Sequence, residues 1–162
     1  MTNGGLKRLT LSAVIASIIM VATMFLKIPT PTGYVHLGDG VIFAASLALG
    51  PELGGLSAAV GSALADILSG YAVWAPWTFF IKGGAGVLVG LAANRHGRKS
   101  QTLAMIAAAV WIVLGYAAGT AKLYSPAAVP GEILGNIAQT GSGVLIGAYL
   151  GPVLKNAAGR KH

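Results

Sequence analysis

The chain alternates between long apolar runs and short polar segments. Six apolar runs follow one another, and glycine, proline or charged residues lie between them. A helix needs roughly 20 apolar residues to cross the hydrocarbon core of a bilayer, and fewer where it is partly buried in protein. The pattern therefore predicts six membrane-spanning helices. They cover residues 9–26, 37–49, 53–68, 76–93, 102–121 and 131–154.

The second and third runs are the shortest, and they are separated only at "GPELGG". Two readings of residues 37–68 stay open. The runs either form two separate spans or together form one hairpin or re-entrant pair.

Composition supports a membrane protein. The chain has 162 residues, of which 55% are hydrophobic and only 9% charged, and its mean hydropathy is +0.74. Soluble domains usually contain about 25% charged residues. So few charges could not cover a water-soluble surface. We therefore expect an all-α polytopic membrane protein, with residues 1–162 forming a single integral-membrane domain.

The net charge of +7 does not indicate a nucleic-acid partner, because the basic residues sit in short clusters between the apolar runs. Positive residues favour the cytoplasmic loops of membrane proteins. This rule places both termini in the cytoplasm. The residues then cytoplasmic are Lys7, Arg8, Arg95, Arg98, Lys99, Lys155, Arg160 and Lys161, and those outside are Lys27 and Lys122.

Three polar and aromatic loops fall together on the outer face in this orientation. They are "PTPTGYVHLGDG" (residues 29–40), "SGYAVWAPW" (69–77) and "KLYSPAAVPGE" (122–132). The first contains two prolines and three glycines, which break helices, and we expect it to be irregular. The grouping favours a small-molecule pocket that opens outward beneath these loops.

The last apolar run carries a polar stripe. Glu132, Asn136, Gln139 and Gly143 follow at intervals of four, three and four, which places them on one helix face. Hydrogen-bonding side chains in a lipid-embedded helix do not face lipid. The stripe therefore lines a polar cavity, or it serves only to hydrogen-bond neighbouring helices.

Asp66 and Lys82 lie inside apolar runs, where a charge is costly and indicates function, whereas Asp39 and Glu132 stand at the starts of the second and sixth runs. Asp66 and Lys82 either form a structural ion pair or line the cavity. Trp74 and Trp77 are either membrane-interface residues or, with Tyr71, surfaces on which an aromatic ring could stack.

Small residues recur four apart along several runs, which lets helix backbones approach closely. In the third, fourth and sixth runs we expect them to pack inside the helix bundle. The first run is the most apolar, and its small residues could instead face a partner protein. These residues are Ser12, Ala13, Ala16 and Ser17.

The sequence gives little support for an enzyme. No histidine lies within an apolar run, the four acidic residues are too few for clustered metal ligands, and there is no cysteine. No phosphate-cradling lysine motif is present, so the chain is not expected to hydrolyse ATP by itself. We expect neither an enzyme nor a bound metal or cofactor. A stand-alone channel or facilitator, or a membrane scaffold, remains the alternative to a binding protein.

Several segments together resemble the substrate-binding S-components of energy-coupling factor (ECF) vitamin transporters. The resemblance is carried by "KIPTPTGYVHLGDG", "LGPELGG", "GSALADILSGY" and "PWTFFIKGGAGVLVG", after a first helix rich in small residues. It covers residues 10–93, and the rest in topology only. The nearest subgroup contains riboflavin, hydroxymethylpyrimidine and pyridoxine S-components.

The resemblance implies six helices in a prokaryotic cell membrane and a vitamin bound near the outer face. It also implies a lid formed by the loop after the first helix, and a shared transmembrane coupling subunit driven by two cytoplasmic ATPases. The small residues of the first helix would contact that subunit. A small heteroaromatic vitamin or riboflavin is the expected ligand, whereas thiamine would favour more negative charge and folate or biotin more positive charge. The expected ligand-binding residues are Tyr34, His36, Asp66, Tyr71, Trp74, Trp77, Lys82, Glu132, Asn136 and Gln139.

Overall fold

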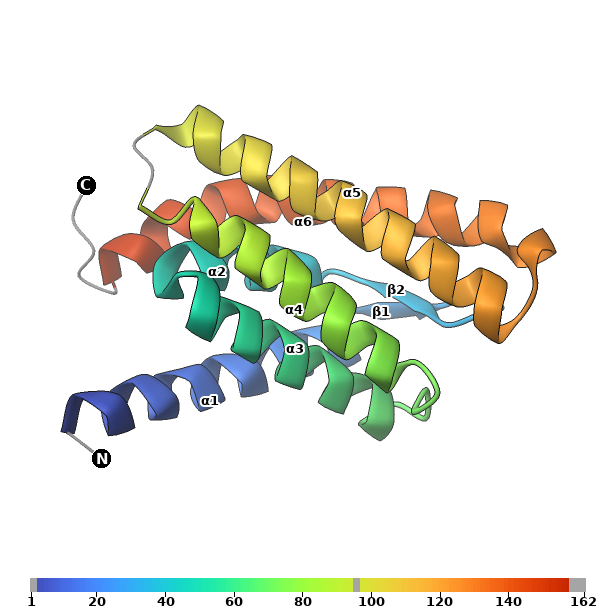
Figure 1. The fold of residues 1–162 in the computed structure, drawn as a ribbon, viewed down its shortest axis with the longest axis horizontal. Helices are drawn as coiled ribbons and strands as arrows, with labels where there is room; N and C mark the ends of the chain where they lie inside the picture. Colours follow the sequence, from blue (N-terminus) through green and yellow to red (C-terminus); the bar gives the residue numbers. More distant parts are fainter. Residues whose placement is uncertain (1–2, 95–96, 158–162) are drawn as a thin grey trace.

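The computed structural model describes residues 3–94 and 97–157. Within them the chain forms six α-helices, a two-stranded hairpin and one short 3-10 helix (Figure 1). Each predicted apolar run becomes one helix with ends a few residues away, which confirms the all-α class. The elements are α1 (Asn3–Phe25), β1 (Lys27–Pro29), β2 (Tyr34–His36), α2 (Gly38–Leu49), α3 (Pro51–Leu68), α4 (Ala75–Leu91), α5 (Arg98–Leu123), η1 (Pro126–Ala128) and α6 (Val129–Ala157).

The helices are not equal as membrane spans. Of the described residues, three stretches are long and apolar enough to cross a bilayer, namely 5–25, 98–123 and 126–156. The α2 helix has 12 residues, so it extends about 18 Å at 1.5 Å per residue. Nearly all of α2 is buried, and it packs against α1, α3, α4 and α6. It is therefore a central helix that covers only part of the bilayer thickness.

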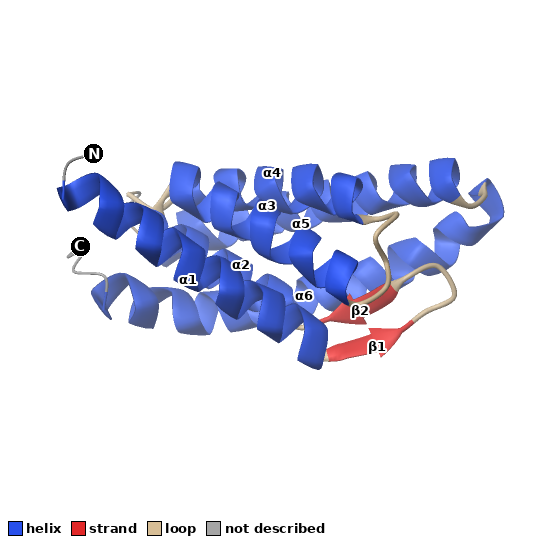
Figure 2. Ribbon diagram, turned by 90° about the horizontal axis from the view of Figure 1, so that it is seen from below, coloured by secondary structure: helices blue, strands red, loops and turns tan. Residues whose placement is uncertain are grey.

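The start of α1 and the end of α6 lie at one end of the bundle, and the hairpin, the α3–α4 connection and η1 lie at the other (Figures 1 and 2). The end that holds the termini also carries most of the predicted cytoplasmic charges. Of these, Lys7, Arg8, Arg98, Lys99 and Lys155 lie in the end turns of helices there, and Arg95, Arg160 and Lys161 are outside the described residues. We call the opposite end, with the hairpin, the outer end.

Glycines bring α2 and α6 together. A Cβ atom added to Gly147 would lie 2.8 Å from Cβ of Phe43, and one added to Gly151 would lie 2.8 Å from Cδ1 of Leu47. Real Cβ atoms do not approach other atoms so closely, so Gly147 cannot be replaced without moving the Phe43 side chain at its base, whereas at Gly151 the flexible end of Leu47 could shift. The expectation that the small residues of the last helix pack inside the bundle is confirmed.

The same close approach joins α3 to α4. A Cβ atom on Gly86 would lie 2.8 Å from the carbonyl oxygen of Gly54 and 3.1 Å from Cβ of Ala58. Without a hydrophobic drive between helices in lipid, such close backbone contact supplies the dispersion attraction that holds them. The small residues of these two helices therefore also serve internal packing.

The segment after the first helix is a β-hairpin, so the prediction of an irregular segment is wrong. Lys27, Ile28 and Pro29 pair antiparallel with His36, Val35 and Tyr34. The turn is closed because the Thr30 N–H donates to the Gly33 carbonyl oxygen at 2.9 Å. Proline is tolerated because a two-stranded sheet consists of edge strands, whose outward N–H groups need no partner.

Candidate ligand-binding site

A small cavity of about 30 Å³ lies beneath the hairpin at the outer end. A water molecule needs roughly 10–15 Å³ of such space, so the cavity has room for about two waters. Its walls come from the hairpin and from every α-helix except α2. The lining residues are Thr23, Gly33, Tyr34, His36, Ser62, Asp66, Trp74, Thr78, Tyr116, Glu132, Asn136 and Gln139.

Side-chain hydrogen bonds hold the hairpin over this cavity, and three of them involve Tyr34 or Thr32. The Tyr34 hydroxyl donates to Oδ1 of Asp66 on α3 at 2.5 Å, and the Thr32 hydroxyl donates to Oε2 of Glu132 on α6 at 2.7 Å. Trp74, next to α4, donates its indole N–H to the Thr32 carbonyl oxygen at 2.7 Å. The hairpin is thereby tied to three separate helical segments and closes the cavity from outside.

The predicted polar stripe of α6 does face this cavity. Asn136 donates from Nδ2 to Oε1 of Glu132 at 2.6 Å, and Gln139 accepts the backbone N–H of His36 on Oε1 at 2.9 Å. Gln139 also donates from Nε2 to Oδ2 of Asp39 at 2.9 Å. The polar stripe therefore lines the cavity, and its hydrogen bonds also hold the hairpin and α2 in position.

A buried ion pair lies beside the cavity. Lys82 on α4 contacts Oδ1 of Asp39 on α2 at 2.5 Å, and both side chains are fully buried. The Lys82 ammonium also lies 5.2 Å from the ring centroid of Tyr116. The hypothesis of an Asp66–Lys82 pair is therefore wrong, because α2 packs against α4 and its first turn supplies the partner carboxylate. Lys82 is outside the cavity lining, whereas Asp66 is part of it.

His36 of the hairpin is neutral. Its side chain is buried, and Nδ1 accepts the backbone N–H of Gly38 at 3.0 Å. Burial and, to a smaller extent, the positive charge of Lys82 lower the pKa of His36 to about 4. In the same hairpin, burial and the carboxylate of Asp66 raise the pKa of Tyr34, so its hydroxyl keeps its proton and donates.

Three polar atoms in the cavity wall have no hydrogen-bond partner among the described residues. They are Oγ1 of Thr23, Oγ of Ser62 and Oδ2 of Asp66, and all three are buried. Buried polar atoms in native proteins are nearly always paired, so an unpaired group suggests a missing partner. A ligand in this cavity would meet two hydroxyls and one carboxylate oxygen with free hydrogen-bonding capacity.

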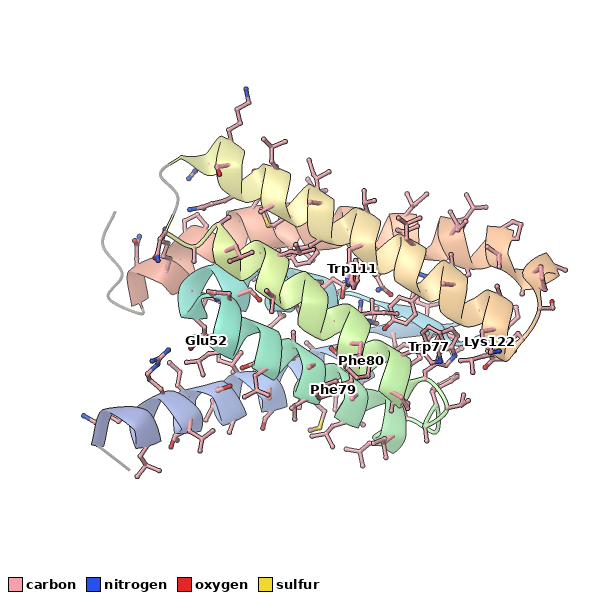
Figure 3. All side chains as sticks on the ribbon, viewed as in Figure 1. Glu52, Trp77, Phe79, Phe80, Trp111 and Lys122 are labelled. Atoms are coloured by element: carbon pink, nitrogen blue, oxygen red, sulfur yellow. The ribbon has the colours of Figure 1, made fainter. Side chains whose placement is uncertain are left out.

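Two predicted aromatic residues lie away from the cavity. Tyr71 packs on Tyr34, with ring centroids 5.0 Å apart, and so supports the hairpin from behind. Trp77 faces the α4–α5 side, where it lines an apolar groove with Phe80 and Trp111 (Figure 3). Of the predicted aromatic surfaces, Trp74 alone borders both the hairpin and the cavity.

Several lining residues were not predicted from the sequence. Thr78 and Tyr116 share a hydrogen bond of 2.9 Å between their hydroxyl oxygens across α4 and α5. Ser62 lies four residues before Asp66, and that spacing would have placed it on the same face of α3. Thr23 and Gly33 gave no comparable signal.

A second cavity of about 320 Å³ lies between the hairpin and the start of α6. Glu132 lines both cavities, and its hydrogen bond to Thr32 holds the hairpin turn against α6. Gly131 and Gly135 leave this second space open because they have no side chains.

The small residues of α1 divide between two faces. Ser12 is buried and shares a hydrogen bond with Ser57 of α3 at 2.8 Å between hydroxyl oxygens, and Ala16 is buried against α3. The prediction that these two contact a partner is therefore wrong, since they serve the α1–α3 contact. Ala13 and Ser17 are exposed on the other face of the helix.

These features define a helical membrane protein with a polar, hairpin-covered cavity at its outer end. The chain belongs to the family of S components of ECF-type riboflavin transporters, because the model of that family matches residues 5–156. The chain is also 38% identical over 146 residues to an "Uncharacterized protein in gap 3'region" of Pyrococcus woesei, covering 87% of this chain and 97% of that protein.

The fold agrees with this assignment. The chain is similar to the crystal structure of the S-component for biotin from an ECF-type ABC transporter, with a TM-score of 0.74 over 99% of this chain and 95% of that chain. The identity is 15%, so this likeness concerns the fold alone. Members of the family are integral membrane proteins that bind the substrate for vitamin uptake and partner with the ECF module, a transmembrane component with ATPases. The resemblance inferred from the sequence is thereby confirmed.

Proposed function

We propose that the chain binds a water-soluble heteroaromatic vitamin or precursor in the cavity beneath the hairpin. Hydroxymethylpyrimidine, pyridoxine and riboflavin are the candidates, and uptake then requires the coupling subunit and its two ATPases. The observation that carries the proposal is the set of unpartnered polar atoms of Thr23, Ser62 and Asp66 on one closed cavity.

The chemistry of the wall suits a flat polar ring. Trp74 and Tyr116 lie with ring centroids 5.5 Å apart, and both line the cavity. Aromatic faces bind heteroaromatic rings by offset or edge contacts. The carboxylates, hydroxyls and amides around them offer donors and acceptors for ring nitrogens and hydroxyl substituents.

Binding requires the hairpin to move. Space for about two waters cannot hold a vitamin, so the contacts of Tyr34 with Asp66 and of Thr32 with Glu132 have to open. Opening the second contact would join the cavity to the larger space between the hairpin and α6. The hairpin is thus the lid of the site, and its polar contacts are replaced by contacts to the ligand.

The test is equilibrium binding by the purified chain in detergent, without ATP. Trp74 contacts both hairpin and cavity, so its fluorescence should change when a ligand displaces the hairpin. Riboflavin, pyridoxine, hydroxymethylpyrimidine, thiamine and pantothenate would be titrated, with calorimetry giving the stoichiometry. Saturable binding of one vitamin, with the fluorescence response lost in Trp74→Phe, supports the proposal. Absence of binding by folded protein, or ionic conductance in its place, would favour a channel or scaffold.

We also propose that Ala13 and Ser17 form the contact with the coupling subunit. They are small and exposed, and the Ser17 hydroxyl donates to the Ala13 carbonyl oxygen at 3.0 Å, so this face presents no unpaired polar group. Such a flat face lets a second helix approach closely in lipid.

A further inference from the structure

The cavity wall contains acidic side chains that are not balanced by basic ones. Asp66 and Glu132 line it, and none of the described lining residues is a lysine or arginine. The nearby Lys82 is neutralised by Asp39, to which it is bound. The histidine in the wall, His36, is neutral because burial lowers its pKa to about 4.

One further cation lies near the site but outside its wall. Lys27, at the base of the hairpin, places its ammonium 5.3 Å from the ring centroid of Tyr34 and 6.0 Å from that of Tyr71. It is absent from the cavity lining, since the Tyr34 side chain forms the wall there. A ligand in the cavity therefore meets two carboxylates directly and, among the described residues, no cation directly.

Both carboxylates accept hydrogen bonds from the hairpin, and a ligand could take the place of these donors. Oδ1 of Asp66 accepts a hydroxyl from Tyr34 and Oε2 of Glu132 accepts one from Thr32, and both donors belong to the mobile lid of the proposed mechanism. Oδ2 of Asp66 has no partner among the described residues, although Asp66 is only 4% exposed. When the hairpin opens, both carboxylates lose donors that a ligand can replace.

We propose that Asp66 and Glu132 select ligands that carry no anionic group. The ligand of this site is a heteroaromatic compound whose substituents donate hydrogen bonds and are neutral or positively charged, and carboxylated or phosphorylated forms of the same ring are rejected. This inference rests on the proposed function. It goes further by naming the two residues that discriminate and the charge class that they exclude.

The physical reason is that an anion placed between these groups meets repulsion in a site shielded from water. Charges near a protein surface interact several times more strongly than they do in bulk water. The carboxylates repel an anionic substituent, and such a substituent also has no donor to offer their unpaired oxygens. Both effects weaken its binding. The anionic form should therefore bind at least about tenfold more weakly than its neutral counterpart.

The experiment compares pairs of compounds that share a ring. The pairs are pyridoxine with 4-pyridoxate, hydroxymethylpyrimidine with the corresponding 5-carboxylate, and riboflavin with its 5′-phosphate. Pyridoxamine adds a cationic member, and biotin an unrelated carboxylate. For whichever ring binds, the anionic member is expected to lose at least about tenfold in affinity, and a cationic member to bind as well as the neutral one or better.

Variants separate charge from size. In Asp66→Asn and Glu132→Gln, shape and acceptor oxygens remain but the charge is removed, so the penalty for the anionic member should shrink several-fold. Glu52→Gln is the matched control, because it removes one negative charge from an exposed side chain at the opposite end, where it pairs with Arg8 at 3.6 Å. Its discrimination should equal that of the unmodified chain.

Three results would overturn the inference. The first is an anionic member that binds as tightly as its neutral partner. The second is a penalty that persists in the double variant Asp66→Asn/Glu132→Gln, since size would then explain it. The third is a penalty that shrinks equally in Glu52→Gln, which would indicate overall charge. If no neutral compound binds at all, the proposed function itself falls, and this inference falls with it.

Discussion

Two aspartates at the outer end of the bundle have opposite surroundings. Asp39 is fully buried, and both of its oxygens are paired, one with Lys82 and the other with Gln139. Asp66 is also buried, but only one of its oxygens is paired, and its partner Tyr34 belongs to the hairpin. The first carboxylate is satisfied entirely by helices, whereas the second accepts a hydrogen bond from the lid and also interacts with the Thr78 hydroxyl on α4.

The difference separates structural polar groups from candidate binding groups. A buried charge with complete partners holds helices in one arrangement, and losing one partner leaves an uncompensated charge. A buried group with free capacity is suited to a partner that arrives later. We therefore expect changes around Asp39 to act on folding and changes around Asp66 to act on ligand binding.

The largest effect is expected from breaking the Asp39–Lys82 pair. Lys82→Met leaves Asp39 buried without its cation, which should lower the free energy of unfolding by about 3–5 kcal/mol. Unfolding in detergent, followed by circular dichroism, measures this loss. The double variant Asp39→Leu/Lys82→Met removes both charges and should recover much of it. Comparable loss in the single and double variants would contradict the account of the pair.

Acid should weaken the hairpin through His36, which is bonded to Gln139 beside this pair. Its pKa of about 4 in the folded chain lies below the usual 6.5, so the unfolded chain takes up the proton first as pH falls. The stabilisation is complete above about pH 6.5 and is lost as pH falls toward 4. The loss is at most about 3 kcal/mol.

Stability measured from pH 7.5 to 4.5 checks this expectation. His36→Asn is the control, because its amide oxygen can accept the Gly38 N–H without titrating. Its stability should change less over the same range. An equal pH dependence in both proteins would show that other groups are responsible.

Changes at polar residues of the cavity wall should act mainly on ligand affinity. Asp66→Ala, Glu132→Ala and Asn136→Ala each remove a hydrogen-bonding group from the wall, which should cost about 1–3 kcal/mol in ligand binding, or roughly ten- to a hundredfold. Calorimetric titration measures the loss, and the same unfolding assay measures stability. If Asp66→Ala lowered stability as much as Lys82→Met and left affinity intact, the contrast between the two aspartates would be lost.

The smallest effect on stability is expected at the exposed face of α1. Ala13→Leu adds volume outside the bundle and should leave unfolding and ligand binding unchanged, while it abolishes co-purification with the coupling subunit and uptake. Ala16→Leu places the same volume against α3 and should cost about 1–3 kcal/mol in stability. Uptake that survives Ala13→Leu would place the partner contact elsewhere.

Periodic features were predictable from sequence, and pairing partners were not. The spacing of Glu132, Asn136 and Gln139 correctly predicted one polar face, because helical geometry alone determines it. The partner of Lys82 was predicted wrongly, since it depends on which helix α2 packs against. The register of α1 was ambiguous for a related reason. Pairs four apart occur on two faces, and only the position of α3 shows that Ser12 and Ala16 point inward.

The hairpin is another feature that could not be predicted from the sequence. Pro29, Pro31 and Gly33 correctly indicated a break between the first two helices, but short strands of three residues leave almost no periodic signal. Their pairing is stabilised from outside, by the contacts of Tyr34 and Thr32 with Asp66 and Glu132. Such contacts between distant parts of the chain become visible only in the folded structure.

The most direct test of the central claim is a titration of the unmodified chain and Asp66→Ala with neutral vitamins, followed by Trp74 fluorescence and calorimetry. The account predicts that one heteroaromatic vitamin binds the unmodified chain one to one without ATP, and that Asp66→Ala binds it roughly ten- to a hundredfold more weakly while unfolding at nearly the same temperature. Folded chain that binds none of these vitamins, or that binds one equally well in both forms, would contradict it.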